Sequence, residues 1–203
     1  MGSLNSDCWY MYTMKDFSKP ITSEPDQTIE ITEEQSNEGD DFVILKVNAR
    51  DRDVGENQRI SYFIKVNNEN VLTTDKFGIN EVTGELRAIG RFDREETERY
   101  ELILVARDHG TPVAFETLRF VTVISKDIND NGPKFPESIS GGGESMVRFT
   151  VPEEENPGYF VGRVKAEDPD AGVNGRVFYY IIGGNEENFF SIDKIYGNIY
   201  TKR

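Results

Sequence analysis

The sequence predicts an all-β protein made of two tandem β-sandwiches. Three observations support this fold class: short runs that alternate apolar and polar residues, turn signals between those runs, and landmarks that recur along the chain at one period. No stretch with apolar residues at 3.6-residue spacing extends beyond a turn or two, so helices are not expected.

Several runs have the composition of half-buried strands. The clearest is 43–49, where Val43, Leu45, Val47 and Ala49 share one face. The other runs are 28–32, 60–66, 100–107, 118–125, 146–151, 177–182 and 189–193. Turn residues such as Thr83-Gly84 and Gly141-Gly142-Gly143 lie between them. A spacing of roughly 8 to 12 residues between short strands is typical of a β-sandwich.

An acidic pattern occurs twice and indicates the repeat. Its copies are Asp51-Arg52-Asp53-Val54-Gly55-Glu56-Asn57 and Asp168-Pro169-Asp170-Ala171-Gly172-Val173-Asn174. The offset is 168 − 51 = 117 residues. A second pair of landmarks, Thr83-Gly84 followed by Leu86 and Tyr196-Gly197 followed by Ile199, gives 197 − 84 = 113 from glycine to glycine. Two landmarks with nearly one offset predict tandem domains of roughly 110 residues, far longer than a solenoid repeat.

The amino-acid composition disfavours some classes of function. The 37 acidic and 23 basic residues give a formal net charge of −14, which disfavours nucleic acid as a partner because phosphates would be repelled. Because the acidic residues recur in fixed patterns, we expect a cation ligand. No run approaches the roughly 20 apolar residues of a membrane span, and the single cysteine, Cys8, excludes an internal disulfide framework.

Four motifs then carry a family resemblance. Asp127-Ile128-Asn129-Asp130-Asn131-Gly132-Pro133 resembles the DxNDNxP linker of cadherin ectodomains, and Phe92-Asp93-Arg94-Glu95 is similar to their LDRE turn. The two Asp-x-Asp-x-Gly-x-Asn segments resemble their DxDxGxN loops, and Tyr100-Glu101-Leu102 leads to Ala106-Arg107-Asp108 as in the family. The resemblance covers about residue 28 to the end and implies Greek-key, immunoglobulin-like sandwiches of seven strands each.

The resemblance also implies a calcium site at the junction of consecutive repeats. Calcium prefers six to eight oxygen ligands, which carboxylates and carbonyls supply. The ligands implied are Glu33, Asp93 and Glu95 of the first repeat; Asp127, Asn129 and Asp130 by side chain and Ile128 and Asn131 by carbonyl in the linker; and Asp168, Asp170 and the carbonyl of Asn174 in the second repeat. Glu34 is an alternative to Glu33.

The implied organisation has four parts. Residues 1–20 are expected to be the tail of a preceding repeat or an appended segment, 21–126 a complete repeat, 127–133 the calcium-binding linker, and 134–203 the N-terminal part of a second, truncated repeat. At the upstream junction Asp51, Asp53 and Asp108 occupy ligand positions, but 15–20 lacks the Asn-Asp-Asn pattern, so we expect little calcium there.

The function expected is that of an extracellular segment of a calcium-dependent adhesion or signalling receptor, anchored in the plasma membrane by a single span elsewhere in the parent protein. Its partners would be other cadherin ectodomains, homophilic or heterophilic. A calcium-binding module of a secreted enzyme or adhesin is the alternative. An EF-hand is disfavoured because Ser138 stands where the loop needs a bidentate Glu. No enzyme is expected, since Asp93 and Glu95 lie on one turn and Cys8 and His109 lie far apart in the chain.

Overall fold

The computed structural model describes residues 21–22, 27–33, 42–136 and 147–203. Regular structure in these ranges is strand throughout, apart from one 3-10 turn at Gly55–Gln58, which confirms the all-β fold class. The chain divides into two compact units, Met1–Lys126 and Asp127–Arg203. The prediction for residues 1–20 and the alternative ligand Glu34 lie outside the described residues.

The first unit is a sandwich of two main sheets. One sheet has the order β2 (Gln27–Thr32), β10 (Glu116–Lys126), β9 (Arg99–Asp108), β5 (Ile60–Val66) and β6 (Glu69–Val71). The other has the order β3 (Phe42–Lys46), β8 (Glu85–Ala88) and β7 (Phe77–Ile79), and the short β1 (Ile21–Thr22) pairs with β4 (Ala49–Arg50). Pairing is antiparallel except between β2 and β10, which run parallel. Strands that neighbour each other out of chain order are typical of Greek-key connections.

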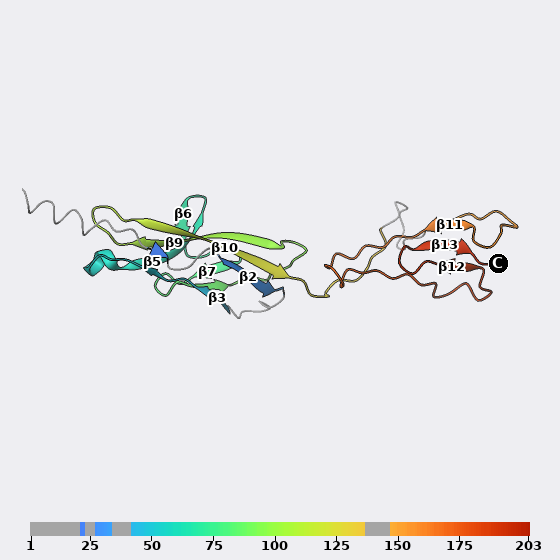
Figure 1. The fold of residues 1–203 in the computed structure, drawn as a ribbon, viewed down its shortest axis with the longest axis horizontal. Coiled ribbons are helices and arrows are strands. Elements are labelled where there is room, and N and C mark those ends of the chain that lie inside the picture. The colour runs from blue at the N-terminus through green and yellow to red at the C-terminus, as the bar shows by residue number, and fades with distance from the viewer. Residues whose placement is uncertain (1–20, 23–26, 34–41, 137–146) are drawn as a thin grey trace, which may run out of the picture. The chain divides into compact units, whose positions relative to one another are not determined.

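Long alternating strands supply most of the core of the first unit. The strands β9 and β10 are the longest and pair over most of their length (Figure 1). Leu104 on β9 and Val123 on β10 are buried with Leu86 of the other sheet. Phe77, Phe92 and Tyr100 form an aromatic group with ring centroids 5.3–5.4 Å apart, an arrangement that adds to the stability gained from burial. This core contains no candidate metal ligand.

The segment from Phe42 to Ala49 departs from the single alternating strand predicted for it. The register of β3 against β8 shifts between Val43 and Leu45, so a bulge places the side chains before and after it on opposite phases. Val43 is therefore exposed, whereas Ile44 and Leu45 both pack against the core. Strict alternation was the wrong prediction here because the bulge inserts one residue into the period.

The second unit contains one three-stranded antiparallel sheet of order β11 (Phe160–Arg163), β13 (Asn198–Thr201) and β12 (Phe190–Ile192). Strand assignments predicted for 147–151 and 177–182 are wrong, since neither segment forms a strand. In the first unit β5 pairs with both β6 and β9. Among the described residues of the second unit, no strand pairs with 177–182, which makes isolated bonds such as Tyr179 N–H to the Lys194 carbonyl, 2.9 Å.

Equivalent hydrogen bonds in the two units bear out the repeat. The Ala49 N–H donates to the Tyr62 hydroxyl at 3.0 Å, and the Ala166 N–H donates to the Tyr179 hydroxyl at 2.9 Å. Similarly, Val47 N–H donates to the Gly84 carbonyl and Val164 N–H to the Gly197 carbonyl. Each acidic loop therefore starts from an alanine that a buried tyrosine holds in place.

Candidate metal centre

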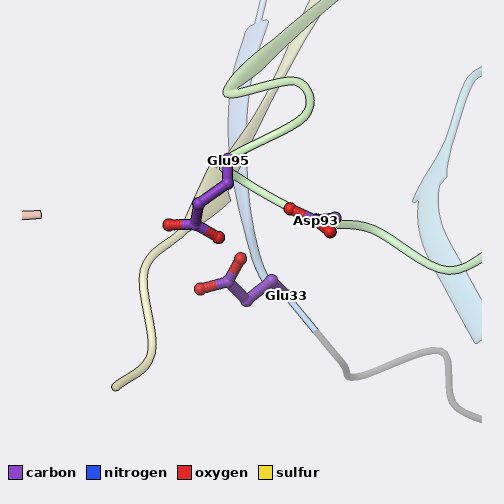
Figure 2. A group of neighbouring side chains, drawn as sticks. All are labelled: Glu33, Asp93 and Glu95. Carbon is purple, nitrogen blue, oxygen red and sulfur yellow. The ribbon is translucent and has the colours of Figure 1, made fainter. Parts of the chain in front are cut away.

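Three carboxylates of the first unit gather at one end of its strands. Glu33, Asp93 and Glu95 each offer an oxygen atom, and these atoms lie within 4.8 Å of one another. Figure 2 shows the carboxylates of Glu33 and Glu95 facing each other, with Asp93 on the same loop as Glu95. Glu33 is 2% exposed, Asp93 is half-buried and Glu95 is exposed. The group is therefore anchored in the protein on one side and open to solvent on the other.

Backbone hydrogen bonds fix this geometry. Glu33 directly follows β2, and its N–H donates to the carbonyl of Lys126 at the end of β10. Its carboxylate Oε2 accepts the N–H of Arg94 at 2.7 Å. Asp93 closes the turn, because its side chain accepts the N–H of Glu96 and its carbonyl accepts the N–H of Thr97. Backbone hydrogen bonds thereby bring carboxylates from two distant segments together.

The local charge of this group is strongly negative but not wholly uncompensated. The Arg94 guanidinium pairs with Glu95, a cation that the sequence reading missed although the residue lies within the LDRE-like motif. Burial raises the pKa of the Tyr100 hydroxyl, and the neighbouring carboxylates of Glu96 and Asp93 raise it further. The pairing of Arg94 with Glu95 therefore offsets part of the negative charge of the three carboxylates.

The donor set fits a hard divalent cation. Calcium binds oxygen ligands at about 2.3–2.6 Å, so two oxygens that share one ion lie within roughly twice that distance, and the three carboxylates meet this condition. Glu33 is almost fully buried, and its Oε2 accepts the Arg94 N–H, so its carboxylate is held in a fixed position beside Asp93 and Glu95. The first unit therefore offers three of the six to eight oxygens that calcium requires.

The second unit holds its acidic residues through a dense hydrogen-bond network. Asp127 accepts the Ala171 N–H through Oδ1 at 2.8 Å and the Asn174 side-chain amide through Oδ2 at 2.9 Å. Asn131 donates its side-chain amide to Asp130 Oδ1 at 2.8 Å and to Asp170 Oδ1 at 3.0 Å. The segment 127–131 is thus bound to the loop 168–174, and the carboxylates of both lie close together.

Local backbone geometry shapes that loop. Asp168 Oδ1 accepts the Asp170 N–H, as Asp51 Oδ1 accepts the Asp53 N–H in the first unit. Gly172 has φ +59°, a left-handed conformation that glycine adopts without strain. Gly175 lies so close to Asp170 that an added Cβ would be 2.1 Å from its carbonyl oxygen. The second Asp of the pattern is consequently buried, and its carboxylate faces the segment 127–131.

The remaining candidate ligands take varied positions. The Ile128 carbonyl accepts the Asp130 N–H, and Asn129 is exposed. Asn174 and Asn131, for which backbone carbonyls were expected to matter, act through their side chains as donors to carboxylates. No sequence pattern predicted this second role. The bonds from the Lys134 and Glu167 N–H groups to each other's carbonyls add a further tie between the two segments.

The upstream junction has three buried carboxylates, those of Asp51, Asp53 and Asp108. Asp108 Oδ1 accepts the N–H groups of Gly110 and Phe115 at 2.9 and 2.8 Å, which accounts for its burial without a metal. Among the residues that the structure describes, these three carboxylates do not form a group with ligand atoms within 4.8 Å. That this junction binds little calcium stays a prediction.

Comparisons with known proteins define the class. The family model described as Cadherin domain matches residues 27–125 and 147–203. The chain is 39% identical over 163 residues to Cadherin-87A of Drosophila melanogaster, covering 80% of this chain and 8% of that protein. It is 34% identical over 187 residues to human Protocadherin-10, covering 91% of this chain and 18% of that protein.

Solved structures agree with the sequence matches. The crystal structure of mouse Cadherin-23 EC22-24 superposes with a TM-score of 0.75 at 29% identity, covering 91% of this chain and 54% of that chain. The chain belongs to the cadherin family, whose members are extracellular adhesion proteins built from repeats. Within the part of the chain that the structure describes, no helix has the length and apolar character needed to cross a membrane.

Proposed function

We propose that this chain is a segment of a calcium-dependent adhesion or signalling receptor, and that calcium restricts the motion of its two repeats relative to each other. The observation that carries this proposal is the group Glu33, Asp93 and Glu95, whose oxygens meet the spacing of a shared calcium ion. The parent protein would be anchored in the plasma membrane, and its partners would be other cadherin ectodomains, homophilic or heterophilic.

Neither repeat alone supplies a complete set of calcium ligands. Three carboxylates of the first unit cannot fill a calcium shell of six to eight oxygens. Asp127, Asp130, Asp168 and Asp170, with the carbonyls of Ile128, Asn131 and Asn174 and the side chain of Asn129, would supply the remaining oxygens. Ions that take ligands from both repeats hold the repeats together, and loss of the ions leaves like charges that repel each other.

Distance measurements between labels on the two repeats test this proposal. After Cys8→Ser removes the native thiol, cysteines at the exposed positions Val82 and Ile195 can carry a pair of spin labels or fluorophores. We expect a narrow distance distribution in millimolar calcium and a broad one in chelator. The far-ultraviolet circular dichroism of the strands should change little, because the core of the first unit is apolar.

A pair of charge-matched variants makes the test specific. Asp130→Asn removes one negative charge at a candidate ligand, and Glu187→Gln removes one at an exposed position outside every motif. Asp130→Asn should broaden the distances at calcium concentrations that saturate the parent protein, and Glu187→Gln should not. Label-to-label distance distributions that do not change when calcium is chelated, or that broaden equally in the two variants, would show that calcium does not couple these repeats.

A further inference from the structure

The chain contains two Asn-Gly dipeptides, Asn131-Gly132 and Asn174-Gly175, and both lie in the second unit. In each, the asparagine amide donates to a carboxylate of the acidic network. The two glycines, however, have different surroundings. Asparagine followed by glycine is prone to intramolecular attack by the next backbone nitrogen, because glycine has no side chain to hinder the approach. The surroundings of the glycine therefore decide which asparagine can react.

We propose that Asn131 is a site of spontaneous deamidation and that Asn174 is protected from it. The Gly132 backbone nitrogen, after losing its proton, attacks Asn131 Cγ. The Cγ–Nδ2 bond breaks, ammonia leaves with a proton from the solvent, and a succinimide ring remains. Water then opens the ring at either carbonyl, which gives aspartate or isoaspartate. The net reaction consumes one water molecule and releases one ammonia, and no oxidant or cofactor is needed.

Gly132 has the freedom that ring formation requires. It is exposed, and a Cβ built on it would meet no atom within 4 Å. Its backbone nitrogen has no hydrogen-bond partner among the described residues. Asn131 donates its side-chain amide to Asp130 in an exposed hydrogen bond and to Asp170 in a part-buried one, and its backbone N–H donates to Asp170 Oδ2 at 3.4 Å. Bonds to water can replace these hydrogen bonds at a modest net cost, and no packed backbone contact has to break. Rotation of the backbone at Asn131 can therefore bring the Gly132 nitrogen to Cγ.

Gly175 lacks this freedom. A Cβ built on it would lie 2.1 Å from the carbonyl oxygen of Asp170 and 3.4 Å from that of Asp168, so its backbone is packed against the acidic loop. The flanking amides are engaged as well, since Asn174 N–H donates to Ala171 and Arg176 N–H to Val173. Moving the Gly175 nitrogen toward Asn174 Cγ would require these contacts to break. The same dipeptide is thus exposed to reaction at one site and held at the other.

Deamidation would reverse the role of residue 131. Its amide now donates to the carboxylate of the neighbouring Asp130 and to that of Asp170, which lies 39 residues further along the chain. A carboxylate in its place cannot donate and would repel both. The reaction would therefore loosen the attachment of the segment 127–131 to the loop 168–174. This inference goes beyond the proposed function and does not depend on calcium.

Peptide mapping by mass spectrometry tests the site. The chain is incubated at mildly alkaline pH in chelator, and the mass gain from amide to carboxyl is followed at both dipeptides. Full unfolding in denaturant should give comparable rates at Asn131 and Asn174, whereas the folded chain should react several-fold faster at Asn131. A rate at Asn174 equal to or above that at Asn131 in the folded chain would overturn the proposal.

Two variants separate the chemistry from its consequence. Gly132→Ala places a Cβ in open space at a residue without a left-handed φ, so the variant should keep the fold. It should slow the reaction at Asn131 several-fold. An unchanged rate would exclude the Gly132 nitrogen as the attacking group. Asn131→Asp should speed hydrogen exchange of the 168–174 amides relative to Asn188→Asp, which adds the same charge elsewhere in this unit. Equal exchange in the two variants would refute the loosening.

Discussion

Neutralising Glu33 should have opposite effects with and without calcium. Glu33→Gln keeps the length of the side chain, and its amide oxygen can still accept the Arg94 N–H that Glu33 Oε2 accepts at 2.7 Å. The substitution removes one of three negative charges whose oxygens lie within 4.8 Å of one another. Repulsion inside the group falls, and so does its affinity for a cation.

The magnitude follows from the geometry. At 4.8 Å, two unit charges repel by about 3 kcal/mol at an effective dielectric of 20 and by about 1 kcal/mol in bulk water. Glu33 takes part in two such pairs, and the Arg94 guanidinium beside Glu95 offsets part of the repulsion. We therefore expect Glu33→Gln to raise the free energy of unfolding of the calcium-free first unit by about 1–3 kcal/mol.

Calcium should reverse the order. A ligand at 100 times its dissociation constant stabilises the folded state by about 2.7 kcal/mol, and Glu33→Gln should lose most of this gain because a buried ligand is missing. Urea unfolding in chelator and in millimolar calcium measures both effects, with hydrogen exchange in β9 assigning the transition to the first unit. Glu69→Gln, at an exposed position on β6, is the charge-matched control.

Two results would refute this reasoning. A variant less stable than the parent protein in chelator would mean that the three carboxylates do not repel one another in the folded state. A variant that calcium stabilises as strongly as the parent protein would mean that Glu33 is not a ligand. The Glu69→Gln control should behave like the parent protein under both conditions.

Two further predictions concern the fold of the first unit. Gly84→Ala should lower the free energy of unfolding by about 2–5 kcal/mol. The new Cβ would lie 2.4 Å from the Val47 carbonyl oxygen, and this clash adds to the cost of a left-handed backbone at alanine. Gly55→Ala, at φ +68° with open space around it, should cost only about 1–2 kcal/mol in the same urea titration. Equal losses would exclude the contact as the cause. Burial acts to raise the pKa of Glu116, but the hydrogen bond and positive charge of Lys65 act in the opposite direction, and the net result is a lowered pKa. Its contribution is complete above the pKa of an unfolded glutamate and is lost as the pH falls through the lower folded value, so Glu116→Gln should destabilise by up to about 1 kcal/mol at pH 7 and by less in acid. A cost independent of pH would contradict this assignment.

Long strands were predicted well because their pattern carries the signal. The range 60–66 matches β5, and 100–107 and 118–125 lie inside β9 and β10, where one face is buried over many residues. The short strands β6, β7 and β8 were missed, since three or four residues give too little alternation to detect. The positions of these strands depend on pairing with neighbouring strands, as β7 pairs with β8. A local sequence pattern does not predict such pairing.

The candidate ligands show a similar division. The family resemblance implied the acidic ligands, and the oxygens of Glu33, Asp93 and Glu95 lie close together. The donors that place those residues were not predictable, because the Arg94 and Ala171 N–H groups act through the backbone and any residue could supply them. The segment 177–182 shows the reverse error: its alternation is that of a strand, but no strand pairs with it among the described residues.

The acidic loops depend on contacts that contain no metal ligand. In each unit a tyrosine hydroxyl accepts the N–H of an alanine two residues before the first Asp of the loop, Ala49 before Asp51 and Ala166 before Asp168. A glycine carbonyl accepts the N–H two residues earlier still. Because these bonds belong to the packed interior, the start of each acidic loop is fixed by the fold of its own unit. Preorganisation of this kind reduces the ordering cost of binding, so under the proposed function more of the free energy of calcium binding would be available to restrain the connection between the repeats.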